Sequence, residues 1–266
     1  MSSLAPLPTA ELAVLGVPAH WQRIDFLSDL HLEAGMPRTF GAWRDHLLHT
    51  PAQAVFLLGD IFEVWVGDDA TDDFSRRCAE VLRESSATRA VYFMPGNRDF
   101  LMGHAWLEPL GVERLPDPCV LAFENGPRCL LSHGDALCLN DPDYLRFRAQ
   151  VRAPDWQQTF LAQPRAAREA IAQQLRRQSR AHQAQAMQAA EVDADAARQW
   201  LGHGGATTLV HGHTHRPADH TLAPGMMRRV LSDWDLEDSA HARAEVLTCQ
   251  ASPAGWQWSR QKPSGA

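Results

Sequence analysis

Five short polar motifs, four of them directly after an apolar run, constrain the fold of this chain most. They are Asp29-Leu30-His31, Gly59-Asp60, Gly96-Asn97-Arg98-Asp99, His133-Gly134-Asp135 and Gly212-His213-Thr214-His215. Buried strands are predicted for the apolar runs 23–27, 54–58, 90–94, 129–132 and 207–210, and helices for 39–50 and 71–86. Strands alternating with helices predict an α/β sheet buried on both faces. Because ligand sites in such sheets lie beyond the carboxyl ends of the strands, the five motifs should form one site.

The remaining segments suggest how the chain is organised. Residues 1–20 predict a loose N-terminal extension, and residues 21–140 with 201–266 predict the core. Between them, residues 141–200 are rich in Ala, Gln and Arg, lack strand candidates and predict an inserted helical cap. After Thr221 the pattern changes to short strand-like pieces, which predict mostly antiparallel pairing and a second sheet; they are 227–231, 244–249 and 256–258.

Composition excludes several classes of protein. The formal charge of −7 argues against a nucleic-acid binder. The five cysteines form no CxxC pair, so neither a disulfide framework nor a cysteine zinc site is expected. Residues 1–20 lack the pattern of a signal peptide, and no run of about 18 apolar residues predicts a membrane span. These features predict a cytosolic protein, soluble or peripheral.

The motifs supply the oxygen and nitrogen ligands that a divalent ion needs to activate water. The candidate ligands are Asp29, His31, Asp60, Asn97, His133, His213 and His215. Asp60 is the natural bridge, because one carboxylate offers an oxygen to each of two ions, which would lie about 3.5–4 Å apart with a hydroxide between them. Each motif alone has a plainer reading: an Asp after a strand is usually a turn residue, and Gly-Asn is a turn signal. All five in order favour the metal site.

Other polar residues in and around the motifs are not expected to bind metal. His211 and Asp135 are expected to orient ligands. Six histidines that belong to no such motif are expected on the surface; they are His20, His46, His49, His182, His203 and His241.

The motifs, with their flanking residues, resemble the UDP-2,3-diacylglucosamine hydrolase branch of the calcineurin-like metallophosphoesterase superfamily. The variants Asn97-Arg98-Asp99-Phe100 and His213-Thr214-His215-Arg216-Pro217 carry the closer match, which covers roughly residues 23–235. The resemblance implies an α/β fold, a two-sheet sandwich flanked by helices with an inserted helical cap. It also implies hydrolysis of the diphosphate bond of UDP-2,3-diacylglucosamine to 2,3-diacylglucosamine 1-phosphate (lipid X) and UMP in lipid A biosynthesis. The implied nucleophile is a hydroxide activated by two divalent ions, typically Mn²⁺.

The resemblance also implies roles for individual residues. One ion would be held by Asp29, His31, Asp60 and His215, and the other by Asp60, Asn97, His133 and His213. The catalytic positions would be Asp60, Asn97, Arg98 and His213. The substrate contacts would be Asn97, Arg98, Asp141, Tyr144, Ser179, Gln183 and His213. The chain departs from the family in its cap, where the usual lysines near the diphosphate are missing: Gln183 and Ala186 stand near those positions, and Arg177 or Arg180 would have to compensate.

Arg98 favours a diphosphate substrate on chemical grounds. Arginine holds its proton too firmly to serve as a general acid, but it stabilises charge on a phosphoryl oxygen. That suits a phosphate leaving group, which needs no proton; the alternative is a simple phosphate clamp. Rival functions are another metallophosphoesterase activity, such as a nucleotide diphosphatase or cyclic-nucleotide phosphodiesterase, and a non-catalytic scaffold.

The cap suggests a lipid substrate. Residues 144–180 carry eight arginines against Asp155 and Glu169, a local charge of +6 that could attract an anionic substrate and anionic membrane lipid. Acyl chains or the bilayer could contact its apolar residues, which are Tyr144, Phe147, Val151, Trp156, Phe160 and Leu161. Alternatively, these residues pack the cap onto the core. We expect a peripheral protein on the cytoplasmic face of the inner membrane.

Overall fold

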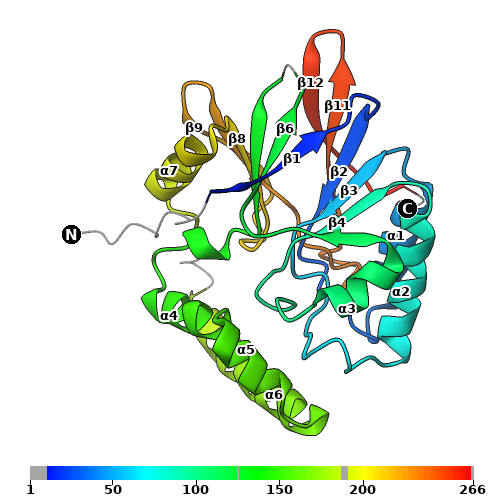
Figure 1. Ribbon diagram of the computed structural model, residues 1–266, viewed down its shortest axis with the longest axis vertical. Coiled ribbons are helices and arrows are strands. Elements are labelled where there is room, and N and C mark those ends of the chain that lie inside the picture. Colours follow the sequence, from blue (N-terminus) through cyan, green and yellow to red (C-terminus); the bar gives the residue numbers. More distant parts are fainter. Residues whose placement is uncertain (1–10, 125, 187–190, 265–266) are drawn as a thin grey trace.

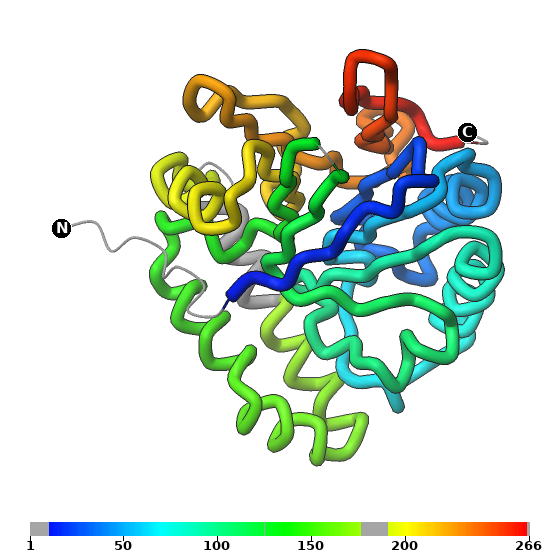
Figure 2. Tube along the Cα trace, turned by 45° about the horizontal axis from the view of Figure 1, so that its top comes forward, coloured from blue at the N-terminus to red at the C-terminus, as the bar shows by residue number. Residues whose placement is uncertain are grey.

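Two six-stranded sheets pack face to face in the computed structural model, which describes residues 11–124, 126–186 and 191–264 (Figures 1 and 2). The first sheet has the order β12 (Gly255–Gln261), β11 (Val246–Ser252), β2 (Arg23–Leu27), β3 (Ala54–Leu57), β4 (Ala90–Phe93), β5 (Val112–Arg114). The second has the order β1 (Ala13–Val17), β6 (Cys119–Phe123), β7 (Arg128–Ser132), β8 (Thr208–His211), β10 (Met226–Val230), β9 (Ala218–Ala223). The expected two-sheet sandwich is confirmed.

Both faces of each sheet are covered, which explains the apolar character of the strands. Successive side chains of a strand point to opposite faces, so Phe56 packs between the sheets while Val55 and Leu57 face helices. The helices on the first sheet are α1 (Pro37–His49), α2 (Asp73–Ser86) and α3 (His104–Leu107), the last followed by the 3-10 turn η1 (Glu108–Leu110). On the second sheet lies α7 (Ala194–Gly204), packed through Trp200. Helices α1 and α2 agree with the predicted ranges.

Three helices project from one end of the sandwich (Figure 1). They are α4 (Pro142–Val151), α5 (Pro154–Leu161) and α6 (Arg165–Ala186), and a 3-10 turn, η2 (Asp135–Leu137), precedes them. The buried guanidinium of Arg168 ties α6 to the core, because it donates to the Val66 carbonyl and pairs with Asp69. Since α7 packs on the second sheet, the expected cap boundary at residue 200 falls within a helix of the core.

The structure corrects two further expectations about the strands. Residues 13–17, expected to be loose, form edge strand β1, which pairs in parallel with β6. Strands β5, β6 and β9 were also not predicted. The second sheet is not made only of residues after 221: β7 and β8 belong to it, β10 pairs in parallel with β8, and β11 joins β2 of the first sheet. Apolar runs mark strands but do not specify their partners.

One histidine expected on the surface is buried. The Nε2 atom of His46 lies 3.4 Å from an oxygen of the buried Asp25, and its Nδ1 atom accepts a hydrogen bond from the backbone of Ser264. The exposed ones are His20, His49, His203 and His241, whereas the side chain of His182 lies outside the described residues. Among the helices that are described, none is long and apolar enough to cross a membrane.

Candidate metal centre

The motif loops meet at the carboxyl ends of parallel strands. Strands β2, β3 and β4 run parallel in one sheet, and β7 and β8 run parallel in the other. Backbone hydrogen bonds join neighbouring loops, such as Asp29 N to Gly59 O and His31 N to Asp60 O, both 3.0 Å. The two sheets are joined at the site itself, where the backbone N–H of His213 donates to the Asp29 carboxylate at 2.9 Å.

The backbone is strained at this site. Five of the candidate ligands have a left-handed conformation; they are Asp29 (φ 54°), His31 (48°), Asp60 (54°), His213 (66°) and His215 (53°). Over the described ranges, no other residue besides glycine has a positive φ. Such conformations cost about 1–3 kcal/mol each and persist where the surrounding structure and function require them. The strain therefore occurs at five of the seven candidate ligands that the motifs supply.

Two motif glycines allow the loops to approach one another closely. A Cβ atom on Gly96 would overlap the carboxylate of Asp60, and one on Gly212 would overlap the carboxylate of Asp29. Any larger residue would push a carboxylate out of place, which explains why Gly precedes both Asn97 and His213.

The seven candidate ligands form one continuous cluster. His215 Nε2 lies 3.4 Å from Asp29 Oδ1 and 3.3 Å from His31 Nε2. On the other side, the Asn97 amide oxygen lies 3.0 Å from His133 Nε2 and 2.9 Å from His213 Nδ1. Two groups of three have donor atoms close enough to hold an ion: Asp29, His31 and His215; and Asp29, Asp60 and His133.

Asp60 lies between the two sides. Its Oδ2 atom is 3.9 Å from His31 Nε2, and its Oδ1 atom is 3.7 Å from His133 Nε2. A bridging carboxylate needs this arrangement, because each of its oxygens must face a different ion. The backbone N–H of Arg98 also donates to Asp60 Oδ1 at 2.8 Å and fixes the carboxylate.

Three of the histidine rings are oriented by contacts at Nδ1, the nitrogen that points away from the cluster. His31 Nδ1 hydrogen-bonds Glu63 at 2.9 Å, His133 Nδ1 donates to the Leu58 carbonyl at 2.9 Å, and His215 Nδ1 lies 3.5 Å from Asp233. These contacts leave each Nε2 facing the cluster. Partners of this kind fix the ring and its tautomer in metal sites.

The electrostatics of the cluster favour a cation. Burial alone would raise the pKa of Asp29, but the hydrogen bond and charge of His215 and the charges of His133 and His31 hold it well below its usual range. Burial would lower the pKa of His133, yet the carboxylates of Asp60, Asp29 and Asp135 raise it to about 9. The donor set is thus rich in negative charge and in oxygen and imidazole ligands, which fits divalent metal ions.

Comparison with known proteins identifies the family. The calcineurin-like phosphoesterase family model matches residues 22–217. A UDP-2,3-diacylglucosamine hydrolase from Cellvibrio japonicus is 43% identical over 218 residues, 79% of this chain and 90% of that protein. The chain belongs to the UDP-2,3-diacylglucosamine hydrolase family of calcineurin-like phosphoesterases. A hydrolase of the same name from Stenotrophomonas maltophilia is 41% identical over 250 residues, 87% of this chain and 95% of that protein.

A solved structure, Vacuolar Protein Sorting 29 from Cryptosporidium parvum, matches 91% of this chain and 97% of its own at 13% identity with a TM-score of 0.42, too distant to inform function.

Next to the cluster, this member of the hydrolase family has an apolar cavity of about 380 Å³, here called the cap cavity. Asn97 and Arg98 are among its lining residues. Its wall is largely aromatic and aliphatic and includes Phe100, Leu101, Tyr144, Phe147, Val151, Trp156, Phe160 and Leu175. Leu161, which was expected with this group, does not line the cavity and is 40% exposed.

The candidate substrate residues of the cap lie in two places. Asp141 caps α4 by accepting from the backbone of Tyr144, and both residues line the cap cavity. The Tyr144 ring stacks on His213 with centroids 6.0 Å apart. Ser179 and Gln183 fall on α6, but their side chains lie outside the described residues, as do those of Arg177 and Arg180.

Three of the described cap arginines turn inward and add little to an exposed basic surface. Arg148 pairs with Asp135 and Asp117, Arg152 donates to the Gly96 carbonyl, and Arg176 pairs with Glu63. All three side chains are mostly buried. Three of the six cap arginines whose side chains are described therefore attach the cap to the metal loops.

The residues that orient the ligands were partly missed. Asp135 was expected to orient a ligand, but its Oδ2 atom accepts from Tyr144 and Arg148 of the cap instead. The expected role for His211 is not seen either, since its Nδ1 hydrogen-bonds the Gly212 carbonyl. Glu63 and Asp233 take this role, and only the position of Glu63, directly after the Gly59-Asp60 motif, offered a signal in the sequence.

Proposed function

We propose that this chain hydrolyses the diphosphate bond of UDP-2,3-diacylglucosamine to 2,3-diacylglucosamine 1-phosphate (lipid X) and UMP, a step of lipid A biosynthesis. One observation carries the proposal beyond family membership: a large apolar cavity opens directly onto Asn97 and Arg98 of the metal cluster. A substrate that combines acyl chains with a diphosphate needs this combination. Small water-soluble phosphodiesters do not.

The seven clustered side chains would hold two divalent ions. Asp29, His31 and His215 would hold one ion, and Asn97, His133 and His213 would hold the other, with Asp60 contributing to both. Their oxygen and imidazole donors suit Mn²⁺. Bound ions would supply an activated water and neutralise phosphoryl charge. Burial and the charge of His133 lower the pKa of His213 to about 4.

Arg98 would act on the substrate directly. It lines the cap cavity beside Asn97, and its buried Nε has no hydrogen-bond partner among the described residues. A buried unsatisfied donor is costly, and a phosphoryl oxygen would satisfy it. Its side chain would thereby stabilise charge on the diphosphate, while its backbone N–H holds Asp60.

The aromatic wall of the cap cavity would hold the acyl chains, and Asp141 and Tyr144, which also line it, would contact the sugar. Ser179 and Gln183 stay candidates for substrate contacts. We place the protein at the cytoplasmic face of the inner membrane. The support is apolar exposure at the cavity: Val64 and Phe147 line it and are 40% and 37% exposed, and Leu161 at the end of α5 is 40% exposed.

A substrate panel on a single Mn²⁺-loaded preparation tests the proposal. The panel is UDP-2,3-diacylglucosamine, a dinucleoside polyphosphate, cAMP and a chromogenic phosphodiester. We expect the diacylated substrate to have the highest kcat/KM by at least about 100-fold, since two acyl chains bury far more apolar surface than the other compounds. Faster cleavage of the dinucleoside polyphosphate or of cAMP would show that the active site serves a different ester.

A further inference from the structure

The cap cavity reaches the metal cluster at Asn97, and another cavity reaches it at His215, a candidate ligand of the other expected ion. The cavity at His215 measures about 390 Å³, within the usual range of about 300–1,000 Å³ for small-molecule sites. We call it the arginine pocket, because three arginines line it; its lining is Glu191, Thr214, His215, Arg216, Pro217, Ala218, His220, Arg228, Val230 and Arg243. Among these, His215 is a candidate metal ligand. Its Nε2 atom lies 3.4 Å from Asp29 Oδ1 and 3.3 Å from His31 Nε2, so the pocket adjoins that side of the cluster, whereas the cap cavity adjoins Asn97.

The arginine pocket contains an incompletely bonded cation. Arg228 is 6% exposed, and its Nε has no hydrogen-bond partner among the described residues. Its other contacts are a 3.3 Å hydrogen bond to the Val192 carbonyl and a 3.7 Å ion pair with Glu191, whose side chain is 62% exposed. A guanidinium this deeply buried normally has closer partners.

The pocket is also linked to the metal cluster. Arg243 pairs with Asp233 at 2.5 Å, and the same Asp233 oxygen lies 3.5 Å from His215 Nδ1. A group bound among these arginines would thus sit one residue away from a ligand of the metals.

We propose that the arginine pocket is the nucleoside subsite, which holds the uridine of the nucleotide half while the cap cavity holds the acyl chains. This inference rests on the proposed function, since it requires a substrate with a diphosphate between a nucleoside and a lipid. A diphosphate lying on the cluster, with its lipid half in the cap cavity, must direct its other half away from that cavity. The carbonyl oxygens of uracil accept hydrogen bonds, which guanidinium groups donate. Pro217 and Val230 offer apolar surface to the flat ring.

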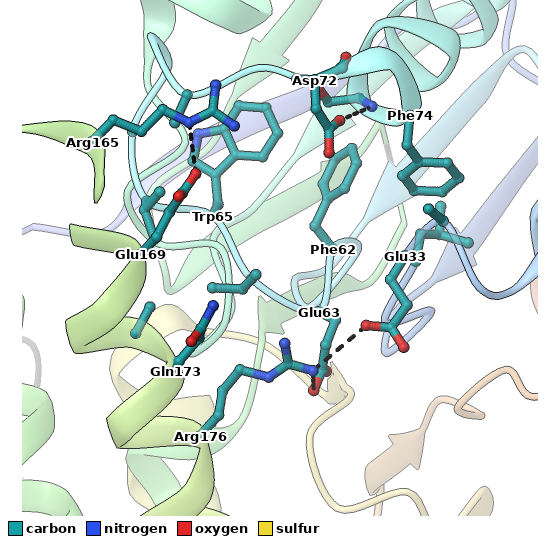
Figure 3. Close-up of a pocket in the computed structure, with 18 residues that line it drawn as sticks. Glu33, Phe62, Glu63, Trp65, Asp72, Phe74, Arg165, Glu169, Gln173 and Arg176 are labelled. Atoms are coloured by element: carbon teal, nitrogen blue, oxygen red, sulfur yellow. Dashed lines mark hydrogen bonds and ion pairs between the residues drawn. The ribbon is translucent and has the colours of Figure 1, made fainter. Parts of the chain in front are cut away.

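Another pocket is a competing location, and its chemistry argues against it. This acidic pocket, of about 270 Å³, lies between α6 and the loop after β3 (Figure 3). Four acids line it (Glu33, Glu63, Asp72, Glu169) against two arginines, and Figure 3 shows both arginines already paired. None of the seven candidate ligands is among its lining residues. The four acids would repel an anionic nucleotide, and Glu63 would separate it from the metal ligands.

Titration calorimetry on the Mn²⁺-loaded protein tests the proposal with two probes. UMP and ribose 5-phosphate share the phosphate and the pentose, so their difference in affinity reports the base. We expect the wild-type protein to bind UMP at least about tenfold more tightly than ribose 5-phosphate, because hydrogen bonds from charged groups to the base supply that much free energy. Arg228→Met and Arg216→Met should each lower the ratio of the two affinities at least about threefold. Arg165→Met in the acidic pocket should leave this affinity gap unchanged.

Several outcomes would overturn the nucleoside subsite. They are equal affinity of wild type for both probes, an unchanged gap in the arginine-pocket variants, and a gap narrowed by Arg165→Met. If Arg228→Met fails to fold, the exposed Arg216 decides the question alone. Turnover of UDP-2,3-diacylglucosamine by wild type, measured in parallel, separates the two proposals. Without turnover the proposed function fails, even if UMP binding follows the predicted pattern.

Discussion

Replacing Arg148 with methionine should destabilise the protein strongly, because this one side chain neutralises two buried carboxylates. Its Nε lies 2.8 Å from Asp135 Oδ2 and its Nη2 lies 3.3 Å from Asp117 Oδ2; the two acids are 0% and 2% exposed and Arg148 is 21% exposed. Methionine keeps the apolar stem but removes the charge. Breaking a buried ion pair costs about 3–5 kcal/mol. Asp135 keeps the Tyr144 hydroxyl and the more distant Arg152, at 3.9 Å, but both acids lose their close cationic partner. We expect a loss in that range in the free energy of unfolding.

The same helix provides a matched control. Arg146 pairs with Asp143 one turn away, but these side chains are 73% and 84% exposed. Arg146→Met should therefore cost less than about 1 kcal/mol. Urea unfolding at pH 7, followed by tryptophan fluorescence and by far-UV circular dichroism, measures both variants. Equal losses for Arg148→Met and Arg146→Met would refute the idea that α4 is anchored electrostatically.

A double-mutant cycle adds a second check on this anchor. Asp135→Asn removes the charge that Arg148 neutralises, so the double variant should lose less stability than the two single losses together. Residues in contact in one network usually couple by about 0.5–3 kcal/mol. Strict additivity would mean that the observed contact carries no energy.

Four further predictions address the site and the core. Asp60→Ala should remove the shared ligand and lower kcat to below about a tenth of wild type while circular dichroism is retained; greater residual activity would contradict the bridging role. Arg98→Ala should keep the metal content, by elemental analysis, and cut kcat on the diphosphate by about 10²–10³; lost metal would make Arg98 structural. Trp156→Ser should lower kcat/KM for the diacylated substrate about 10–100-fold but barely alter a small phosphodiester; equal losses would point to a role in folding. Asp25→Asn should be destabilising at pH 7. Burial would raise the pKa of Asp25, but His46, whose Nε2 lies 3.4 Å away, the hydrogen bond from Thr50 and the charge of Arg23 hold it below its usual value. The folded state therefore favours the charged form of Asp25. In urea titrations, the difference in free energy of unfolding between wild type and Asp25→Asn should shrink below about pH 4. A difference that stays constant with pH would exclude a titrating Asp25.

The sequence predicted the motif strands and the clustering of the ligands for a physical reason. Runs such as 54–58 are apolar on both faces, and the polar residues follow where each strand ends, so parallel pairing places them at one edge. Gly96 and Gly212 belong to recognisable motifs because loop contact leaves no room for a Cβ. Local pattern and tertiary requirement coincide at these positions.

Features that depend on distant partners were not predictable from local pattern. Strand β1 lies at a sheet edge, with Val14 52% exposed, so its apolar signal is weak. The assignment of β7 and β8 to the second sheet depends on pairings with β6 and β10. Likewise, composition reveals the charge of the cap but not that Arg148 and Arg176 turn inward to acids of the core.

The most direct test of a two-metal diphosphatase titrates Mn²⁺ into metal-free protein and follows UDP-2,3-diacylglucosamine and its products by chromatography of samples quenched with a chelator. The account predicts no reaction without metal, equal release of UMP and 2,3-diacylglucosamine 1-phosphate, and a rate that saturates near two ions per chain, as expected for a site with a bridging carboxylate. Release of UDP, turnover without metal, or saturation at about one ion per chain would contradict it.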